Sequence, residues 1–210
     1  MRIGITQRVE TVAGYGEVRD CLDQNWFRFL EAVGVTPIPI PNSLANPVKW
    51  YQDVSLEALV LSGGNDLSEL IGAKNVSRER DRTEKSLLEH CRKMKHPVIG
   101  VCRGMQLMGS MDNQKLVQVE HHAGTRHRVT MRTMELPILP EVNSYHNWAF
   151  DKLSDQSEYE VVATTDEGHI ECIMHHNLPW IGMMWHPERE NSFNESDIEL
   201  FQKLLFTKTK

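Results

Sequence analysis

The sequence predicts an α/β fold: a mostly parallel central sheet flanked by helices, with a smaller antiparallel β portion in the second half. In the first half, short apolar runs alternate with amphipathic segments of helical spacing, the pattern of strand–helix units around a parallel sheet. In the second half, short β-like runs follow one another with few helical signals between them. The chain has 210 residues without an internal repeat or linker, so we expect a single domain over residues 1–210.

The first half supplies the strands and helices of the parallel part. Extended segments are expected at residues 2–6, 35–41, 56–64 and 97–101, the second because prolines at alternate positions exclude a helix. Helical spacing of apolar residues predicts helices at 20–34, which Gly34 closes, and at 80–94. Ligands bind beyond the carboxyl ends of the strands in such sheets. The glycines after residue 62 and Cys102 both fall at that edge.

The second half is expected to be mainly extended. The β-like runs cover residues 127–133, 158–165, 169–176 and 180–185. A final helix over 194–206 has Asn194 or Ser196 available as its N-terminal cap.

Composition and charge exclude several classes of protein. A formal net charge of −6 argues against a general nucleic-acid or acidic-membrane surface. No apolar run approaches the roughly 20 residues that span a bilayer, and the first residues do not resemble a signal peptide, so we expect a cytoplasmic protein. The oligomeric state stays open.

The four cysteines show neither a disulfide framework nor zinc-ligand spacing. They are widely scattered, at Cys21, Cys91, Cys102 and Cys172. The histidine pairs His121–His122 and His175–His176 look like metal pairs, but neighbours on a strand point apart, so a solvated surface is favoured. We therefore expect no metal and no cofactor.

Cys102 alone has a context that chemistry would use. The apolar run Val98–Val101 ends at this residue, and an amphipathic run begins directly after it. A side chain at a strand-to-helix turn projects from the sheet edge toward the first N–H groups of the helix. Those groups and the helix dipole favour negative charge, and hence the nucleophilic thiolate. Cys102 is therefore a candidate nucleophile.

A cysteine nucleophile needs a base and a group that orients the base. His186 directly follows a buried apolar strand, and Pro187 turns the chain there. Glu188, two positions on, can fold back onto the imidazole and fix its tautomer.

The segments GVCRGMQ and WHPE together resemble the catalytic motifs of the class I glutamine amidotransferases, and LSGGND resembles that family's oxyanion turn. The segments RDRTE and VNSYHNWA are similar to those of the stand-alone γ-glutamyl hydrolase branch. The resemblance covers nearly the whole chain and implies the flavodoxin-like class I glutaminase fold.

The resemblance also implies roles for single residues. Cys102 is the expected nucleophile, His186 the base and later acid, and Glu188 the orienting carboxylate. The backbone N–H groups of Gly64 and Arg103 match the oxyanion hole. The remaining matches are substrate contacts: Gln106 at the position that holds the glutamyl group, and the segment that binds its α-amino and α-carboxylate ends, Asn143, Ser144, Tyr145 and His146.

Three functions remain open: a stand-alone hydrolase of a γ-glutamyl amide, a glutaminase subunit that supplies ammonia to a separate synthetase, and a non-catalytic module. An intact set of three catalytic residues disfavours the last. The expected partner is a small-molecule γ-glutamyl amide. Whole-chain resemblance points to a bacterial group that acts on a γ-glutamyl-CDP-amidate in capsule phosphoramidate assembly, and a γ-glutamyl-aminobutyrate hydrolase is the alternative.

The leaving group is the least determined feature. The segment after Met108 is shorter than in relatives and lacks their glycine pair, so the loop beside the site is remodelled. Arginine binds phosphate oxygens in a bidentate fork. The phosphates of a nucleotide leaving group could therefore be bound by Arg126, by Arg128, or by the set Arg78, Arg80 and Arg82. The alternatives without a binding role are an exposed strand for Arg126 and Arg128 and a solvated helix start for the other three arginines.

Overall fold

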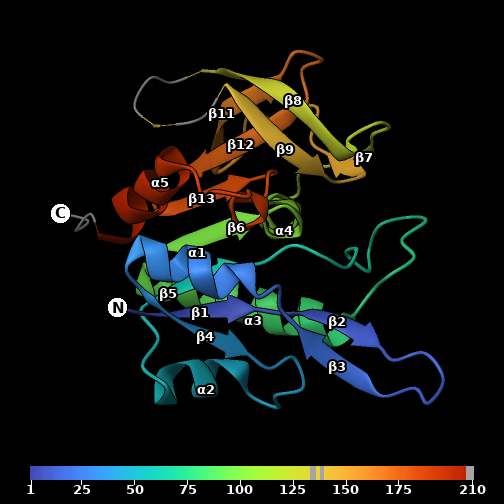
Figure 1. Ribbon diagram of the computed structural model, residues 1–210, viewed down its shortest axis with the longest axis vertical. Coiled ribbons are helices and arrows are strands. Elements are labelled where there is room, and N and C mark those ends of the chain that lie inside the picture. The colour runs from blue at the N-terminus through green and yellow to red at the C-terminus, as the bar shows by residue number, and fades with distance from the viewer. Residues whose placement is uncertain (133–135, 138–139, 207–210) are drawn as a thin grey trace.

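One long sheet organises the molecule. The computed structural model describes residues 1–132, 136–137 and 140–206. Within these residues nine strands form one sheet in the order β4-β1-β5-β6-β13-β12-β11-β8-β9 (Figure 1). Their bounds are β4 Thr36–Ile40, β1 Arg2–Thr6, β5 Ala58–Leu61, β6 Val98–Val101, β13 Trp180–Met183, β12 Ile170–His175, β11 Tyr159–Thr165, β8 Ala123–Met131 and β9 Glu141–Tyr145.

The sheet changes from parallel to antiparallel at β13. The pairs from β4 to β13 are all parallel, whereas β12, β11, β8 and β9 continue the sheet with antiparallel pairs. The predicted fold class is thus confirmed, and the antiparallel portion extends the same sheet. The expected run at 127–133 forms most of β8, although its last residue, Thr133, lies outside the described residues.

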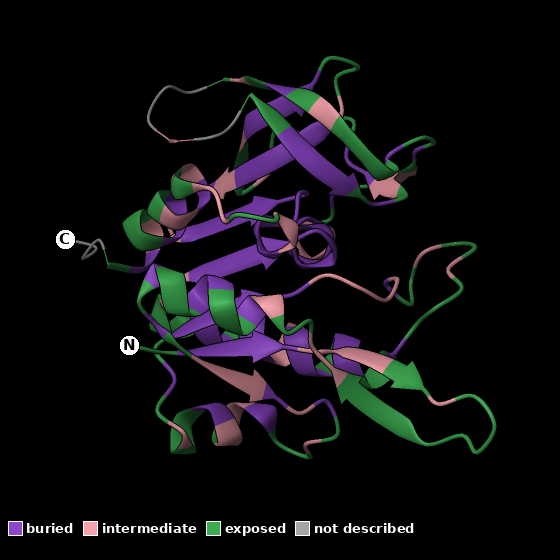
Figure 2. Ribbon diagram, viewed as in Figure 1, coloured by how far each residue is buried: buried purple, intermediate pink, exposed green. Residues whose placement is uncertain are grey.

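Helices cover both faces of the parallel part. The helices α1 (Asn25–Val33) and α5 (Glu195–Phe206) pack on one face, and α2 (Pro47–Asp53), α3 (Arg78–Met94) and α4 (Arg103–Met111) pack on the other. Along β5, Ala58 and Val60 enter the first core while Leu59 and Leu61 enter the second, as the two-residue repeat of a strand requires. Figure 2 shows the central strands buried on both faces.

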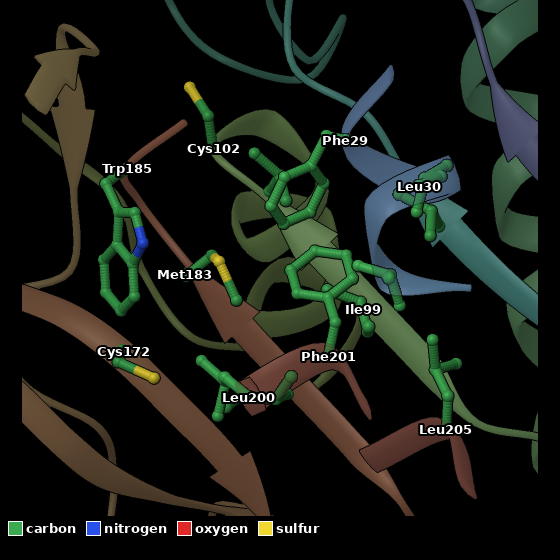
Figure 3. Packing of buried hydrophobic residues seen from close by; sticks show 14 of the residues in the cluster. Phe29, Leu30, Ile99, Cys102, Cys172, Met183, Trp185, Leu200, Phe201 and Leu205 are labelled. Carbon is green, nitrogen blue, oxygen red and sulfur yellow. The ribbon is translucent and has the colours of Figure 1, made fainter. Parts of the chain in front are cut away.

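The first core is built on edge-to-face aromatic packing. Phe29 of α1 and Phe201 of α5 lie 4.9 Å apart between ring centroids at an interplanar angle of 87°. Figure 3 shows the two rings above β6 and β13, with Cys102 at the margin of the same cluster. The core therefore reaches the strand ends at which the candidate nucleophile lies.

The expected helix over 20–34 is wrong at its start. Residues Val18–Cys21 form strand β3, which pairs with β2 (Arg8–Thr11) in an exposed hairpin, and α1 begins only at Asn25. Two acidic side chains explain this boundary. Asp20 accepts hydrogen bonds from the backbone N–H and side-chain amide of Asn42, and Asp23 accepts one from the N–H of Asn25.

Several other elements, strand β9 among them, were not predicted from the sequence. Helix α2 begins after Asn46, whose side chain accepts a hydrogen bond from the N–H of Lys49 at 2.8 Å, with Pro47 in the first turn. Strands β7 (Val117–Gln118) and β10 (Trp148–Ala149) form a small antiparallel pair. Asn194 rather than Ser196 caps α5, because its side chain accepts from the N–H of Ser196 at 2.9 Å. None of the helices in the described ranges is long and apolar enough to cross a membrane.

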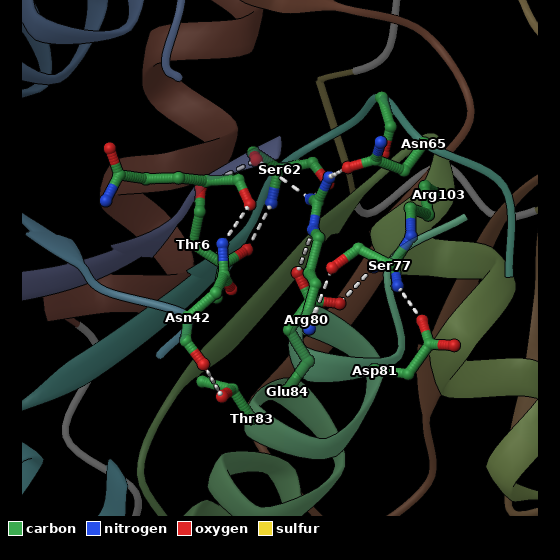
Figure 4. Close-up of polar contacts among 12 residues, drawn as sticks. Thr6, Asn42, Ser62, Asn65, Ser77, Arg80, Asp81, Thr83, Glu84 and Arg103 are labelled. Atoms are coloured by element: carbon green, nitrogen blue, oxygen red, sulfur yellow. Dashed lines mark hydrogen bonds and ion pairs between the residues drawn. The ribbon is translucent and has the colours of Figure 1, made fainter. Parts of the chain in front are cut away.

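A buried network of charged side chains joins α3 to the two turns at the sheet edge (Figure 4). Arg80 pairs with Glu84 at 2.8 Å, and Glu84 also pairs with Arg103 in the first turn of α4. Asp81 forms a second ion pair with Arg103. Burial alone would raise the pKa of Glu84, but Arg103 and Arg80 outweigh burial and lower that pKa, so Glu84 is ionised.

Replacing Glu84 with Gln should strongly destabilise the fold, because it leaves two buried guanidinium groups without their shared carboxylate. We expect the free energy of unfolding, measured by urea denaturation, to fall by about 3–5 kcal/mol. The matched control is Glu69→Gln, which removes an exposed ion pair with Lys85 and should cost less than about 1 kcal/mol. Equal, small losses in both variants would show that the network does not support the fold.

Candidate active site

Cys102 occupies a strained turn between β6 and α4. Its backbone has φ 53° and ψ −106°, a conformation that L-residues rarely adopt and that surrounding contacts must hold. The N–H of Cys102 donates to the carbonyl of Met183 at 2.7 Å, and its own carbonyl accepts from the N–H of Gln106 at 3.1 Å. The residue is therefore fixed both to the neighbouring strand and to the helix that it starts.

The start of α4 lies directly against the neighbouring strand β5. A Cβ atom on Gly104 would come within 2.3 Å of the carbonyl oxygen of Leu61, so only glycine permits this approach. The first amide groups of the helix, beginning with Arg103, consequently lie at the edge of the sheet beside Cys102.

His186 and Glu188 form the second half of the site. The His186 Nδ1 atom lies 2.7 Å from Glu188 Oε1, and both side chains are buried. The short 3₁₀ turn Pro187–Arg189 brings the carboxylate back to the imidazole. The backbone of His186 is held on both sides by the amide of Asn143, which accepts from its N–H and donates to its carbonyl, each at 2.8 Å.

The charge on His186 is coupled to both neighbours. Burial alone would lower the pKa of the imidazole, but the negative charges of Glu188 and Cys102 outweigh burial and raise the pKa to about 9. A raised pKa keeps the ring protonated at neutral pH.

Gly63 lies between Cys102 and His186. A Cβ atom at this position would lie 2.5 Å from His186 Cε1 and 3.5 Å from the Cβ of Cys102. The absence of a side chain therefore lets the imidazole and the Cys102 turn come together at the end of β5.

The glycine turn after β5 is fixed by the guanidinium of Arg80. This group donates to the carbonyls of Ser62 at 2.6 Å, Gly63 at 3.1 Å and Gly64 at 2.5 Å (Figure 4). Gly64 has φ 79°, in the region that favours glycine. Three carbonyl groups are thus directed toward α3, and the same network holds Arg103 through Glu84.

A pocket of about 190 Å³ opens beside Cys102. One wall is formed by the two turns and includes Gly64, Arg103 and Gln106, and the other is formed by residues 145–148. Gln106 donates through Nε2 to the carbonyl of Trp148 at 3.0 Å, which ties the two walls together.

The predicted substrate segment 143–146 divides into different environments. Asn143 and Ser144 are buried, and the Asn143 amide is occupied by His186 and Glu190. Tyr145 is exposed and its ring lies 5.6 Å from that of His186. The His146 side chain turns into a group of histidines beneath β9. Of the four side chains, only that of Tyr145 is exposed beside His186.

The structure corrects two surface expectations. The predicted solvated helix start fails for Arg80, which is 0% exposed, whereas Arg78 and Arg82 are exposed. The histidine pairs are also not simply surface residues. His122 and His175 are buried while their neighbours His121 and His176 are exposed, as residues that point apart should be.

Sequence reasoning singled out the segment around Arg80 but missed what it does. The positions Arg80 and Glu84 share the buried face of α3 with Leu87, Leu88 and Cys91. A charged pair at spacing i, i+4 within an apolar stripe is the signal that could have revealed a buried ion pair.

Comparisons with known proteins agree with this architecture. Residues 2–188 match the family model described as Peptidase C26. The chain is 34% identical over 199 residues to the gamma-glutamyl-CDP-amidate hydrolase of Campylobacter jejuni, covering 94% of this chain and 95% of that protein. It is 28% identical over 194 residues to protein NtpR of Enterococcus hirae, covering 79% and 80%.

Solved structures show the same fold. A putative GMP synthase component from Thermoplasma acidophilum superposes with a TM-score of 0.70 at 18% identity, covering 98% of this chain and 92% of that one. A glutamine amidotransferase from Thermotoga maritima gives a TM-score of 0.64 at 15% identity, covering 98% and 84%. The chain belongs to the peptidase C26 family, a class I glutamine amidotransferase-like family.

Proposed function

We propose that this protein is a cysteine-dependent hydrolase of a γ-glutamyl amide. The observation that carries the proposal is a cysteine on a strained turn between a strand and a helix, together with a buried histidine and carboxylate. The His186 Nδ1 atom lies 2.7 Å from Glu188 Oε1. The 34% identity to a hydrolase named for a γ-glutamyl substrate supports the same activity.

The proposed reaction proceeds through a thioester. The Cys102 thiolate attacks the γ-carbonyl carbon, and the N–H groups of Gly64 and Arg103 stabilise the oxyanion of the tetrahedral intermediate. His186 then donates its proton to the leaving nitrogen as the C–N bond breaks, leaving the γ-glutamyl group on sulfur. His186 next takes a proton from water, the resulting hydroxide attacks the thioester, and glutamate and the Cys102 thiolate are released.

The other cysteines are poorly suited to this reaction. Burial raises the pKa of Cys91 to about 12 and raises that of Cys172 further still. Burial and the charge of Glu10 also raise the pKa of Cys21. These three groups are thiols at neutral pH, and the thiolate is the nucleophilic form.

For the leaving group we propose a nucleotide-linked amidate, following the substrate in the name of the Campylobacter relative. Two of the arginines that were expected to bind a phosphate are already engaged in contacts within the protein. The Arg80 guanidinium donates hydrogen bonds to the glycine turn, and Arg126 forms ion pairs with Glu141 and Glu190. Arg8 is also ion-paired, with Glu10 at 2.9 Å, but it is better placed than Arg126, because its half-exposed side chain packs on Gly64 at the glycine turn.

A glutamine-like chloroketone should add mass to Cys102 alone, because this reagent needs both a thiolate and a pocket for the glutamyl group. Peptide mass spectrometry locates the label, and Cys102→Ala should abolish both labelling and turnover without changing the circular dichroism spectrum. The matched control, Cys91→Ala, should keep both. Label spread over Cys21, Cys91 and Cys172 would refute the assignment.

The pH dependence of kcat/KM should show an alkaline limb at about pH 9, where His186 loses the proton that it must give to the leaving nitrogen. Glu188→Gln should move this limb to lower pH, because removing the carboxylate charge removes a cause of the raised pKa. Its rate should fall less than the 10²–10⁴-fold expected for His186→Ala. Glu195→Gln, an equal charge change at an exposed position, should leave the limb in place; an unmoved limb in Glu188→Gln contradicts the pairing.

Substrate choice is decided by comparing kcat/KM for glutamine, γ-glutamyl-aminobutyrate and a γ-glutamyl nucleotide phosphoramidate. The glutamyl half is common, so any preference must come from the leaving group. We expect the nucleotide amide to be preferred by about a hundredfold or more. Arg8→Gln should reduce this preference and leave glutamine turnover unchanged. The matched control is Arg19→Gln, on the same hairpin and likewise ion-paired, with Glu17; it should change neither.

Two other outcomes separate the alternatives. Preference for γ-glutamyl-aminobutyrate would replace the nucleotide proposal and keep the hydrolase. Glutamine as the best substrate, and only with a synthetase added, would instead support an ammonia-supplying subunit.

A further inference from the structure

A second group of reactive side chains lies in the antiparallel part of the sheet. We call it the His–Glu cluster, and it consists of His122, His127, His146 and Glu171. His122 precedes β8, His127 lies in β8, His146 follows β9 and Glu171 lies in β12 (Figure 1). Three of the four are buried and His127 is partly buried, so these residues converge inside the protein.

The donor atoms of the cluster are closely spaced. The Nε2 atoms of His127 and His146 each lie 3.3 Å from Glu171 Oε1, and His122 Nδ1 lies 3.4 Å from His146 Nε2. One donor atom from each of the four residues can be chosen so that all lie within 4.8 Å of one another.

Hydrogen bonds among the described residues do not explain this arrangement. Glu171 is 0% exposed, yet neither of its carboxylate oxygens has a hydrogen-bond partner of good geometry there, and His127 Nε2 also has none. A buried carboxylate that lacks well-aligned hydrogen bonds is costly, and the neighbouring imidazoles add further buried polar groups. Such a cluster calls for a cation at its centre.

We propose that the His–Glu cluster binds a Zn²⁺ ion through three imidazoles and one carboxylate. Zinc bonds of about 2.0–2.1 Å at tetrahedral angles place neighbouring donor atoms about 3.3 Å apart. Three donor pairs of the cluster lie 3.3–3.4 Å apart, and all four donor atoms lie within 4.8 Å of one another. Imidazole and carboxylate are donors that zinc accepts in proteins.

The outer nitrogens of two histidines are held as metal-bound histidines usually are. His146 Nδ1 lies 3.1 Å from the carbonyl oxygen of Trp148, which directs Nε2 into the cluster. His122 Nε2 lies 3.5 Å from Glu167 Oε2, which leaves Nδ1 for the metal. A carbonyl or carboxylate on the far nitrogen fixes both the tautomer and the ring orientation of a ligand.

Four protein ligands make this a structural rather than a catalytic zinc site, because no coordination position is left for substrate. A pocket of about 310 Å³ lined by His121, His122, His127 and Glu167 gives the ion a path of entry. Since His146 belongs to the pocket wall formed by residues 145–148, the ion would tie that wall to β8 and β12.

The test is the metal content of the untagged protein, measured by plasma mass spectrometry after incubation with one equivalent of Zn²⁺ and desalting. We expect about one zinc per chain. The variants His127→Ala and Glu171→Gln should retain at least tenfold less, with circular dichroism confirming that they are folded. His175→Ala is the matched control, because His175 is buried in β12 but lies outside the cluster.

Cobalt substitution distinguishes an ordered site from loose binding. Co²⁺ in the wild type should give the intense visible absorption of tetrahedral coordination, and this absorption should be absent in His127→Ala. Wild-type protein that retains less than a tenth of an equivalent of zinc and gives no such band would overturn the proposal, whether or not the variants fold. Zinc retained equally by His127→Ala and Glu171→Gln would overturn it too.

Discussion

The structure of the site depends on the buried ion-pair network around Arg80. Its guanidinium fixes three consecutive carbonyls of the glycine turn, and Glu84 connects it to Arg103, the residue that follows the proposed nucleophile Cys102. Breaking such a network leaves buried charges without partners, which is more costly than the loss of an exposed pair. Buried ion pairs of α3 thereby set the relative position of the glycine turn after β5 and the Cys102 turn after β6.

The parallel pairing of β6 with β13 supplies the second constraint. Val101 lies opposite Met183, so Cys102 and the segment leading to His186 leave the sheet at the same edge. The Cys102 N–H to Met183 carbonyl bond secures this register at its end. Glu188 then reaches His186 through a local turn, while Asn143 holds the His186 backbone from the antiparallel side. The proposed catalytic side chains are thus positioned by both the parallel and the antiparallel parts of the sheet.

The antiparallel extension forms one wall of the pocket beside Cys102. Residues 145–148 connect β9 to β10 and face the turns at Gly64 and Arg103. Two features hold this connection in place. The Gln106 side chain donates a hydrogen bond to the carbonyl of Trp148, and the His146 side chain is part of the His–Glu cluster. Residues 145–148 are therefore bound to helix α4 on one side and to the proposed metal site on the other.

The sequence by itself determined the strand–helix alternation, the change to antiparallel β structure, and the candidate nucleophile, base and carboxylate. These features follow from local periodicity and from short motifs, since a strand-to-helix joint or a His-x-Glu turn is encoded within a few residues. Tertiary structure decided the β2–β3 hairpin, the burial of Arg80 and the convergence of His122, His127, His146 and Glu171. Burial depends on which distant segments meet, and no local pattern specifies that His122 before β8 meets Glu171 in β12.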